Sequence, residues 1–183
     1  MNFVRSISGY NHLWAVRDEA KDADELTMLF RQWSNANYLL DFFLANLDDL
    51  QGFFHVQKIS DAIKDTMEDA KSLERLILDF PYTEQLDSLF HPLSLADNRV
   101  RELTREKARN WDRDRHASWL RIYAIRIEPN VYIVTGGTIK LTATMQEREH
   151  TQIELNKLNA CRNYLQQNGI FDKDSFVDFL EED

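Results

Sequence analysis

One long amphipathic pattern constrains this chain more than any other feature. Across residues 56–80 the apolar side chains recur every three or four positions, while Lys, Asp and Glu occupy the opposite face. The run ends at Phe80-Pro81, and a residue that precedes proline avoids the α region. The pattern predicts an amphipathic helix over 56–80. Its apolar stripe must be buried, either on the body of the protein or in a partner's groove.

Shorter patterns precede this helix. Residues 10–17 are aromatic and apolar and are followed by a charged stretch, which predicts a first strand. The apolar residues of 26–33 have helical spacing, and a second apolar cluster follows at 38–47. The polar residues of 34–37 are expected to bend the chain between the two clusters.

The period of the apolar residues changes from helical to two in the C-terminal half. The alternation predicts strands over 117–127 and 131–134, and the turn residues 128–130 between them predict a hairpin. The alternation assigns the residues of the first strand to two faces. One face would carry Trp119, Arg121, Tyr123 and Ile125, and the other Leu120, Ile122, Ala124 and Arg126.

The pattern after this hairpin predicts the rest of the C-terminal half. Residues 136–137 are both glycine, which is typical of a bulge or of a close backbone approach, and the alternation continues over 139–144. A helix is predicted over 149–167, with the Asn-Gly pair at 168–169 as its C-terminal stop. Residues 173–181 could form a last short helix.

The charge of the chain is unevenly distributed along its length. The net charge of −9 argues against a protein that coats nucleic acid non-specifically. Residues 1–98 have a net charge of −9, and residues 127–183 a net charge of −5. Residues 99–126, in contrast, hold nine basic and four acidic residues, a net charge of +5. This basic island is either a phosphate-binding face or an ordinary solvated surface.

Several classes of protein are disfavoured by the sequence. The single cysteine, Cys161, cannot form an internal disulfide, and its helical spacing to apolar neighbours suggests a buried small hydrophobe. No run of eighteen apolar residues predicts a membrane span, and the N-terminus does not read as a signal peptide. Five scattered histidines have no metal-ligand spacing. A cytoplasmic protein without metal or cofactor and without a membrane partner is expected.

Three short segments, in their order along the chain, resemble one known family. Arg101-Glu102-Leu103-Thr104-Arg105 would open a β-meander, Leu120-Arg121-Ile122-Tyr123 would lie in its next strand, and GGTIKLT at 136–142 leads into EHTQIEL at 149–155. This combination resembles the RelE/HigB group of bacterial toxins. The resemblance implies an α+β, RelE-like fold with a small antiparallel sheet and packed helices. The chain would be a single domain over 1–183, with a helical elaboration at 18–97 and the meander plus helix at 98–169.

The resemblance also implies a function. Toxins of this group cut mRNA in the decoding site of the ribosome, so the chain would be the toxin component of a toxin–antitoxin pair. Its partners would be a cognate antitoxin and, for activity, the ribosome and mRNA. The cut requires the 2′-hydroxyl to attack the adjacent phosphate, which calls for cations on the phosphate and for groups that move protons.

The candidate residues follow from this chemistry. Arg121 matches the family's arginine and would clamp the phosphate, or else it is a strand residue paired with Glu102 or Glu128. Lys140 would stabilise the transition state, or else it is an ordinary edge-strand lysine. The remaining catalytic candidates are Arg148 and His150, at the start of the last long helix. The candidates for binding RNA are Arg105, Lys107, Arg109, Trp111 and His116, with Trp111 able to stack on a base and His116 also a proton-transfer candidate.

A second reading belongs to a different class of protein. The same fold could serve as a catalytically silent binding or regulatory protein. The acidic N-terminal region favours this alternative. The basic island, with Arg121 and Lys140, favours the toxin.

Overall fold

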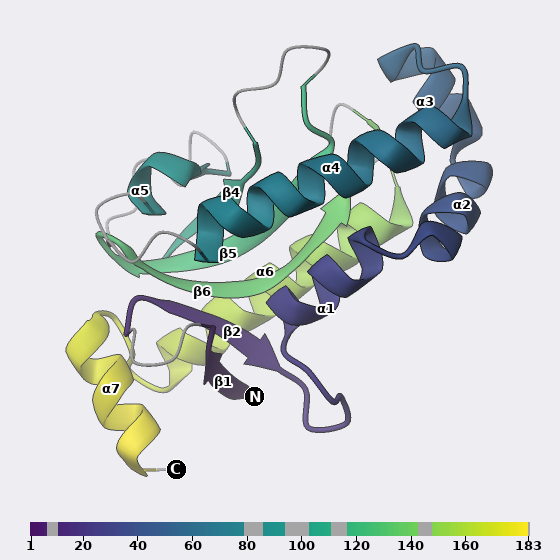
Figure 1. Ribbon diagram of the computed structural model, residues 1–183. Coiled ribbons are helices and arrows are strands. Elements are labelled where there is room, and N and C mark those ends of the chain that lie inside the picture. The colour runs from purple at the N-terminus through teal and green to yellow at the C-terminus, as the bar shows by residue number, and fades with distance from the viewer. Residues whose placement is uncertain (7–10, 79–85, 94–102, 111–116, 143–147, 183) are drawn as a thin grey trace.

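The computed structural model describes residues 1–6, 11–78, 86–93, 103–110, 117–142 and 148–182 (Figure 1). These residues form one six-stranded mixed sheet and seven helices, so the predicted α+β class is confirmed. The strands are β1 (Asn2–Arg5), β2 (Leu13–Arg17), β3 (Phe90–Pro92), β4 (Thr104–Ala108), β5 (Leu120–Glu128) and β6 (Val131–Ile139). Their order in the sheet is β1-β2-β6-β5-β4-β3.

The predicted antiparallel meander is present as β4, β5 and β6. The sheet is larger than the meander, because β2 pairs with β6 in parallel and the short strands β1 and β3 add to the two edges. The segment predicted to open the meander, Arg101 to Arg105, begins outside the described residues. Strand β4 itself starts at Thr104.

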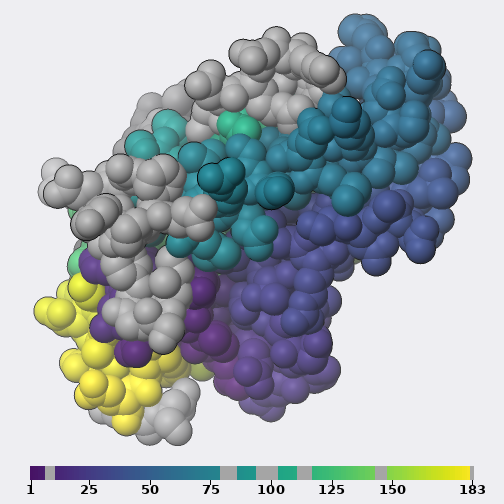
Figure 2. All heavy atoms as spheres, viewed as in Figure 1, coloured from purple at the N-terminus to yellow at the C-terminus, as the bar shows by residue number. Residues whose placement is uncertain are grey.

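The helices divide between the two faces of the sheet. Their bounds are α1 (Glu25–Trp33), α2 (Ala36–Ala45), α3 (Leu47–Phe54), α4 (Ile59–Leu78), α5 (Leu86–Leu89), α6 (Glu149–Gln167) and α7 (Lys173–Glu182). Helices α1 and α4 lie across one face, whereas α6 runs along the other (Figure 1). Seen from the side of α4, helices α1 to α4 form one continuous surface (Figure 2).

Local signals explain where several helices begin and end. The side chain of Asp24 accepts a hydrogen bond from the backbone of Thr27 and caps α1, and Asn35 caps α2 in the same way. Asn35 therefore forms the predicted bend between these helices. Helix α6 has the predicted bounds, and Gly169 beyond its end has a φ of 69°. Helix α4 is shorter than the predicted 56–80; residues 79 and 80 lie outside the described residues.

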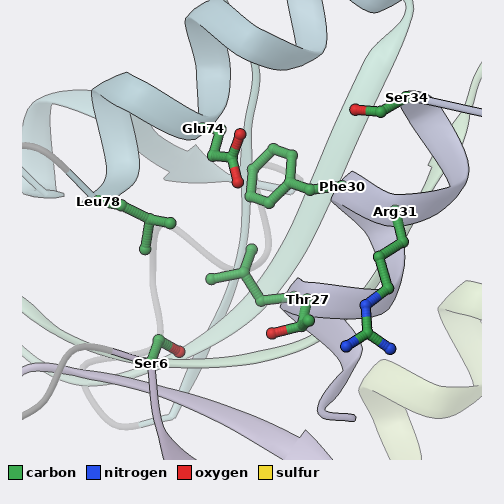
Figure 3. A pocket seen from close by; sticks show the side chains of 8 residues that line it. Ser6, Thr27, Phe30, Arg31, Ser34, Glu74 and Leu78 are labelled. Atoms are coloured by element: carbon green, nitrogen blue, oxygen red, sulfur yellow. The ribbon is translucent and has the colours of Figure 1, made fainter.

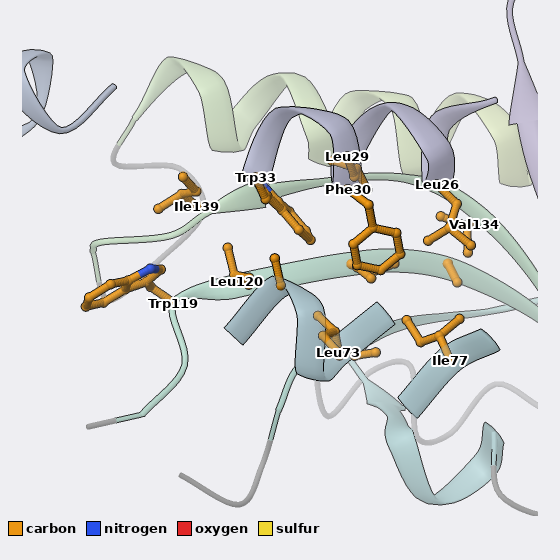
Figure 4. Close-up of a cluster of buried hydrophobic side chains, with 14 of the residues drawn as sticks. Leu26, Leu29, Phe30, Trp33, Leu73, Ile77, Trp119, Leu120, Val134 and Ile139 are labelled. Atoms are coloured by element: carbon orange, nitrogen blue, oxygen red, sulfur yellow. The ribbon is translucent and has the colours of Figure 1, made fainter. Parts of the chain in front are cut away.

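The first core lies between the sheet and helices α1 to α4 (Figure 4). The apolar stripe of α4 is therefore buried on the body of the protein, through residues such as Leu73 and Ile77. Trp119 belongs to this core, where its ring lies 5.9 Å from the ring of Phe43 and 5.2 Å from that of Phe54. The prediction that Trp119 shares a face with Arg121 is wrong. Trp119 precedes the first residue of β5, so the alternation of that strand does not determine its direction.

The second core lies on the opposite face, between the sheet and helices α6 and α7. Phe176 of α7 is fully buried there and contacts Trp14 of β2 and Phe3 of β1 through edge-to-face rings. Both faces of β5 are consequently buried along most of the strand. The helix α7 predicted at 173–181 is thus an integral part of this second core.

The hairpin of β5 and β6 contains the predicted turn and bulge. Asn130 in the turn has a φ of 62°, and the register shifts between Tyr123 and Ala124. Strand β6 ends at Ile139, so the predicted continuation over 139–144 is wrong as far as Leu141 and Thr142 are concerned. The main chain of Lys140 still donates a hydrogen bond to the carbonyl of Trp119.

Gly137 provides a first testable prediction. A Cβ at this position would lie 2.5 Å from the carbonyl oxygen of Arg121 and 2.7 Å from a methyl carbon of Leu29. We expect Gly137→Ala to destabilise the protein by about 1–3 kcal/mol, because backbone and core would have to move. Urea unfolding followed by circular dichroism measures this loss. Gly52→Ala is the control, because nothing lies within 4 Å of its Cβ position. Equal stabilities of the two variants would contradict the close packing of β6.

A candidate phosphate-binding face

The geometry of the meander gathers three cations on one face of the sheet. Alternation along β4 places Arg105 and Lys107 on the face that α6 shares, away from the buried Ala108. The charge of Arg109, one residue beyond the strand, acts on both Lys107 and Arg121. Lys107 pairs across the strands with Tyr123 of the second core, and continuing this antiparallel register brings Arg109 next to Arg121. We call Lys107, Arg109 and Arg121 the cationic cluster. All three side chains are half-buried.

The members of the cationic cluster weaken one another's proton affinity. Burial lowers the pKa of Arg121 to about 10, and the neighbouring charge of Arg109 adds to this effect. Burial also lowers the pKa of Lys107, with further contributions from Arg121 and Arg109. The pKa of Arg109 is lowered by burial. Such a concentration of half-buried positive charge has a strong attraction for an anion.

The guanidinium of Arg121 is held from one side only. Its Nη1 donates to the carbonyl oxygens of Ser118 at 2.5 Å and Leu120 at 2.7 Å. Its Nε and Nη2 have no hydrogen-bond partner among the described residues, and the same holds for the ammonium of Lys107. The Nε and Nη2 donors form the fork that binds two oxygens of a phosphate or carboxylate. This half-satisfied arginine is therefore suited to hold an oxyanion.

Two neighbours define the border of the cationic cluster. Tyr123 lies directly across from Lys107; it is 1% exposed, and burial raises its pKa, so it forms a neutral aromatic wall. Its hydroxyl has no hydrogen-bond partner within the described ranges. Arg105 lies two residues before Lys107 in β4, and its side chain donates a hydrogen bond to Asn159 of α6 at 2.8 Å. Arg105 thus shares the face of the cluster but is bound to the helix.

The structure describes two of the other candidates from the sequence, Lys140 and Arg148. The ammonium of Lys140 donates to the carbonyl of Thr142 at 2.8 Å. Arg148 forms a two-point ion pair with Asp49 at the start of α3. Neither residue has a recorded interaction with the cationic cluster in the described part of the chain. Trp111 and His116 lie outside the described residues. The sequence offered Glu102 and Glu128 as alternative partners of Arg121. Glu128 is not paired with Arg121, and Glu102 lies outside the described residues.

His150 is held by the helical region. A ring nitrogen of His150 lies 3.1 Å from the carbonyl oxygen of Ile139, and the ring meets Phe42 edge-on at 5.3 Å. Burial lowers the pKa of His150. The acidic N-terminal half therefore supplies, in Phe42 and Asp49, contacts to His150 and Arg148.

The lowered pKa of His150 predicts a pH-dependent stability. The unfolded chain binds a proton at this histidine more readily than the folded protein does, so the contribution is complete above the ordinary pKa of 6.5 and is lost as the pH falls below it. We expect His150→Gln to flatten the fall in unfolding free energy between about pH 7.5 and pH 5.5. Urea unfolding across this range measures it. His12, whose pKa is also lowered, still contributes to the pH dependence of the unfolding free energy in the variant. An unchanged slope would contradict the prediction.

Sequence reasoning missed one residue that shapes this face. The carbonyl of Ser118 holds Arg121, yet a lone serine before a strand gives no recognisable signal. The grouping of Lys107 with Arg105, in contrast, follows from alternation along β4 once the strand is placed.

A hollow elsewhere on the protein has no group of like charges that would select a ligand. The hollow, of about 320 Å³, lies between α1 and α4, with Phe30 at its wall (Figure 3). Its rim combines Arg31 with Glu74, and Arg31 is already paired with Asp22, so no single charge dominates. Among the described residues no three His, Cys, Asp or Glu side chains are grouped so as to hold a metal ion. No described helix is long and apolar enough to cross a membrane.

The fold and the face define an α+β protein with a cationic cluster on a sheet whose strand β5 is buried along most of its length. Comparison with known proteins adds no relative: no family model, no curated protein and no solved structure matches the chain.

Proposed function

We propose that the protein is the toxin component of a bacterial toxin–antitoxin pair and that it binds an mRNA phosphate at the cationic cluster. The observation that carries this proposal is the free Nε and Nη2 edge of Arg121 beside Lys107, two cations without an acidic partner among the described residues. The order of elements also supports it, because a strand, helices, an antiparallel meander and a helix follow one another as the sequence resemblance implies.

The proposed reaction is metal-independent cleavage of RNA. The 2′-oxygen attacks phosphorus, the bond to the 5′-oxygen breaks, and a 2′,3′-cyclic phosphate and a 5′-hydroxyl result. Arg121 binds the phosphate oxygens and stabilises the charge that develops on them. Lys107 adds a second positive charge beside the phosphate, and solvent water takes up the proton of the 2′-hydroxyl and protonates the leaving oxygen. Arg148 is ion-paired with Asp49, and His150 contacts Phe42 and the carbonyl of Ile139, so the proposed reaction assigns neither residue a step.

The partners follow from the same charge. A cognate antitoxin would cover the cationic cluster with an acidic segment and so compete with RNA for Arg121. The protein would act in the cytoplasm, where mRNA is translated on ribosomes. The acidic N-terminal half keeps the total charge at −9, which disfavours non-specific binding to nucleic acid and restricts contact to the cluster.

A second candidate function is a catalytically silent RNA-binding regulator. The observation that favours it is the engagement of His150, a proton-transfer candidate from the sequence, with Ile139 and Phe42. Such a protein would bind RNA phosphates through the same cluster and cut nothing.

Primer extension on mRNA from a cell-free bacterial translation reaction tests the proposal. The purified protein is added with ribosomes present or absent, and binding of a short single-stranded RNA is measured separately by fluorescence anisotropy. Cuts that require ribosomes and vanish with Lys107→Met support the toxin. Binding without cuts supports the silent regulator. If the folded protein neither binds nor cuts RNA, both proposed functions are overturned.

A further inference from the structure

Helix α4 presents buried polar groups to the segment that enters β5. Asp69 is 2% exposed and Thr66 is fully buried. Ser118 Oγ donates to Asp69 Oδ2 at 2.5 Å, and the indole nitrogen of Trp119 donates to Thr66 Oγ1 at 2.9 Å. A buried carboxylate is unfavourable unless hydrogen bonds and opposite charge compensate for its desolvation. The position of Asp69 therefore requires an explanation that packing alone does not supply.

The contact at Asp69 continues to Arg121. Ser118 Oγ, held by Asp69, also accepts from the main-chain nitrogen of Leu120 at 3.2 Å. The carbonyls of Ser118 and Leu120 are the two acceptors of Arg121 Nη1. The carboxylate on α4 thus acts on the local backbone at 118–120, and that backbone orients the guanidinium. The charge of Asp69 additionally raises the pKa of Arg121, against the stronger effects of burial and of Arg109.

We propose that Asp69 is a positioning residue that acts through Ser118 to hold Arg121 with its Nε and Nη2 edge toward an RNA phosphate. The inference rests on the proposed function, since the phosphate is the ligand assigned to the cationic cluster. It gives the helical region a direct part in that function. Helix α4 packs on one face of the sheet, yet it orients an arginine whose cluster lies on the other.

Four variants separate positioning from the alternatives. Asp69→Ala and Ser118→Ala remove the acceptor and the hydroxyl of the relay. Asp69→Asn removes the charge but retains an oxygen that can accept from Ser118. Thr66→Ala is the matched control, because it breaks the neighbouring buried hydrogen bond between the same helix and Trp119. All four are compared as folded proteins with cooperative unfolding.

The expected result is a split between the variants. Asp69→Ala and Ser118→Ala weaken binding of the short RNA about tenfold, as expected for the loss of one well-oriented charged contact, whereas Asp69→Asn and Thr66→Ala stay within about threefold of the parent protein. If Asp69 acted only through its charge, Asp69→Ala and Asp69→Asn would both tighten binding. If its role were only structural, all variants would unfold more easily with unchanged affinity. Either of these results overturns the proposal.

A readout without RNA separates this inference from the proposed function. Nitrogen-15 NMR of the arginine side chains, with the Arg121 signal assigned by its absence in Arg121→Lys, reports restricted rotation of the guanidinium. We expect restricted rotation of the Arg121 guanidinium in the parent protein, in Asp69→Asn and in Thr66→Ala. In Asp69→Ala and Ser118→Ala we expect the guanidinium to rotate freely, so that its NMR signals are averaged. Should the parent protein bind no RNA, the proposed function falls while the relay is still judged by this signal. Equal signals in all variants would overturn the relay.

Discussion

Arg121→Ala is expected to weaken binding of single-stranded RNA about ten- to a hundredfold, because hydrogen bonds to a charged group contribute about 1.5–3 kcal/mol. The Nε and Nη2 of this arginine donate no hydrogen bond among the described residues, so they are available to a phosphate. The salt dependence of binding should also become shallower, by about 0.7 in the slope of log K against log salt for one lost phosphate contact. The Arg121→Ala variant should also no longer be toxic when its expression is induced in bacteria. Fluorescence anisotropy at several salt concentrations and a growth assay measure these effects.

Two further variants make this prediction specific. Arg121→Lys retains the charge but not the two-donor fork, so it should recover only part of the affinity. Arg31→Ala removes the same charge from α1, where Arg31 is exposed and paired with Asp22. We expect no measurable loss of RNA binding there. An Arg121→Ala protein that is folded, binds RNA like the parent and remains toxic would remove the cationic cluster from the function.

Trp119→Ala should cause the largest loss of stability among the substitutions considered. The side chain is fully buried, its ring contacts Phe43 and Phe54 from α2 and α3, and its indole donates to Thr66 of α4. Removing a buried tryptophan costs about 3–5 kcal/mol, and a domain is typically stable by only about 5–15 kcal/mol. We expect a large shift of the urea midpoint. The acceptor on Thr66 would also lose its donor.

Controls for Trp119→Ala come from the same region. Trp119→Phe retains an aromatic ring and loses the hydrogen bond, so it should cost about 1–2 kcal/mol. Phe53→Ala in α3 should be close to neutral, because this side chain is 55% exposed. A loss below about 1 kcal/mol for Trp119→Ala would mean that α2 and α3 are not anchored at this residue.

Helical periodicity accounted for most of the successful predictions. The bounds of α6 agree with the sequence prediction, and α1 and α4 lie where their apolar spacing placed them. Spacing in a helix is a local property, and so are the capping side chains of Asp24 and Asn35. The strands β1 and β3 escaped prediction because four and three residues are too few to show a period.

The candidate site was predictable in part. The basic island contained Arg105, Lys107, Arg109 and Arg121, and alternation along β4 is enough to place Arg105 and Lys107 on one face. Their meeting with Arg121 depends on the register of β4 with β5, which no local pattern specifies. Arg148 and His150 matched the chemistry in type, yet Asp49 and Phe42 engage them from helices about one hundred residues earlier in the chain.

What the sequence determined by itself is therefore part of the set of elements: the helices α1, α4, α6 and α7, the hairpin of β5 and β6, and the positive charge at 99–126. Each of these depends on interactions between residues a few positions apart. The tertiary structure alone decided that Trp119 joins the helical core and that Ser118 carries the influence of Asp69 to Arg121. Those contacts join residues on different elements, so only the register of the sheet and the packing of α4 on it could bring them together.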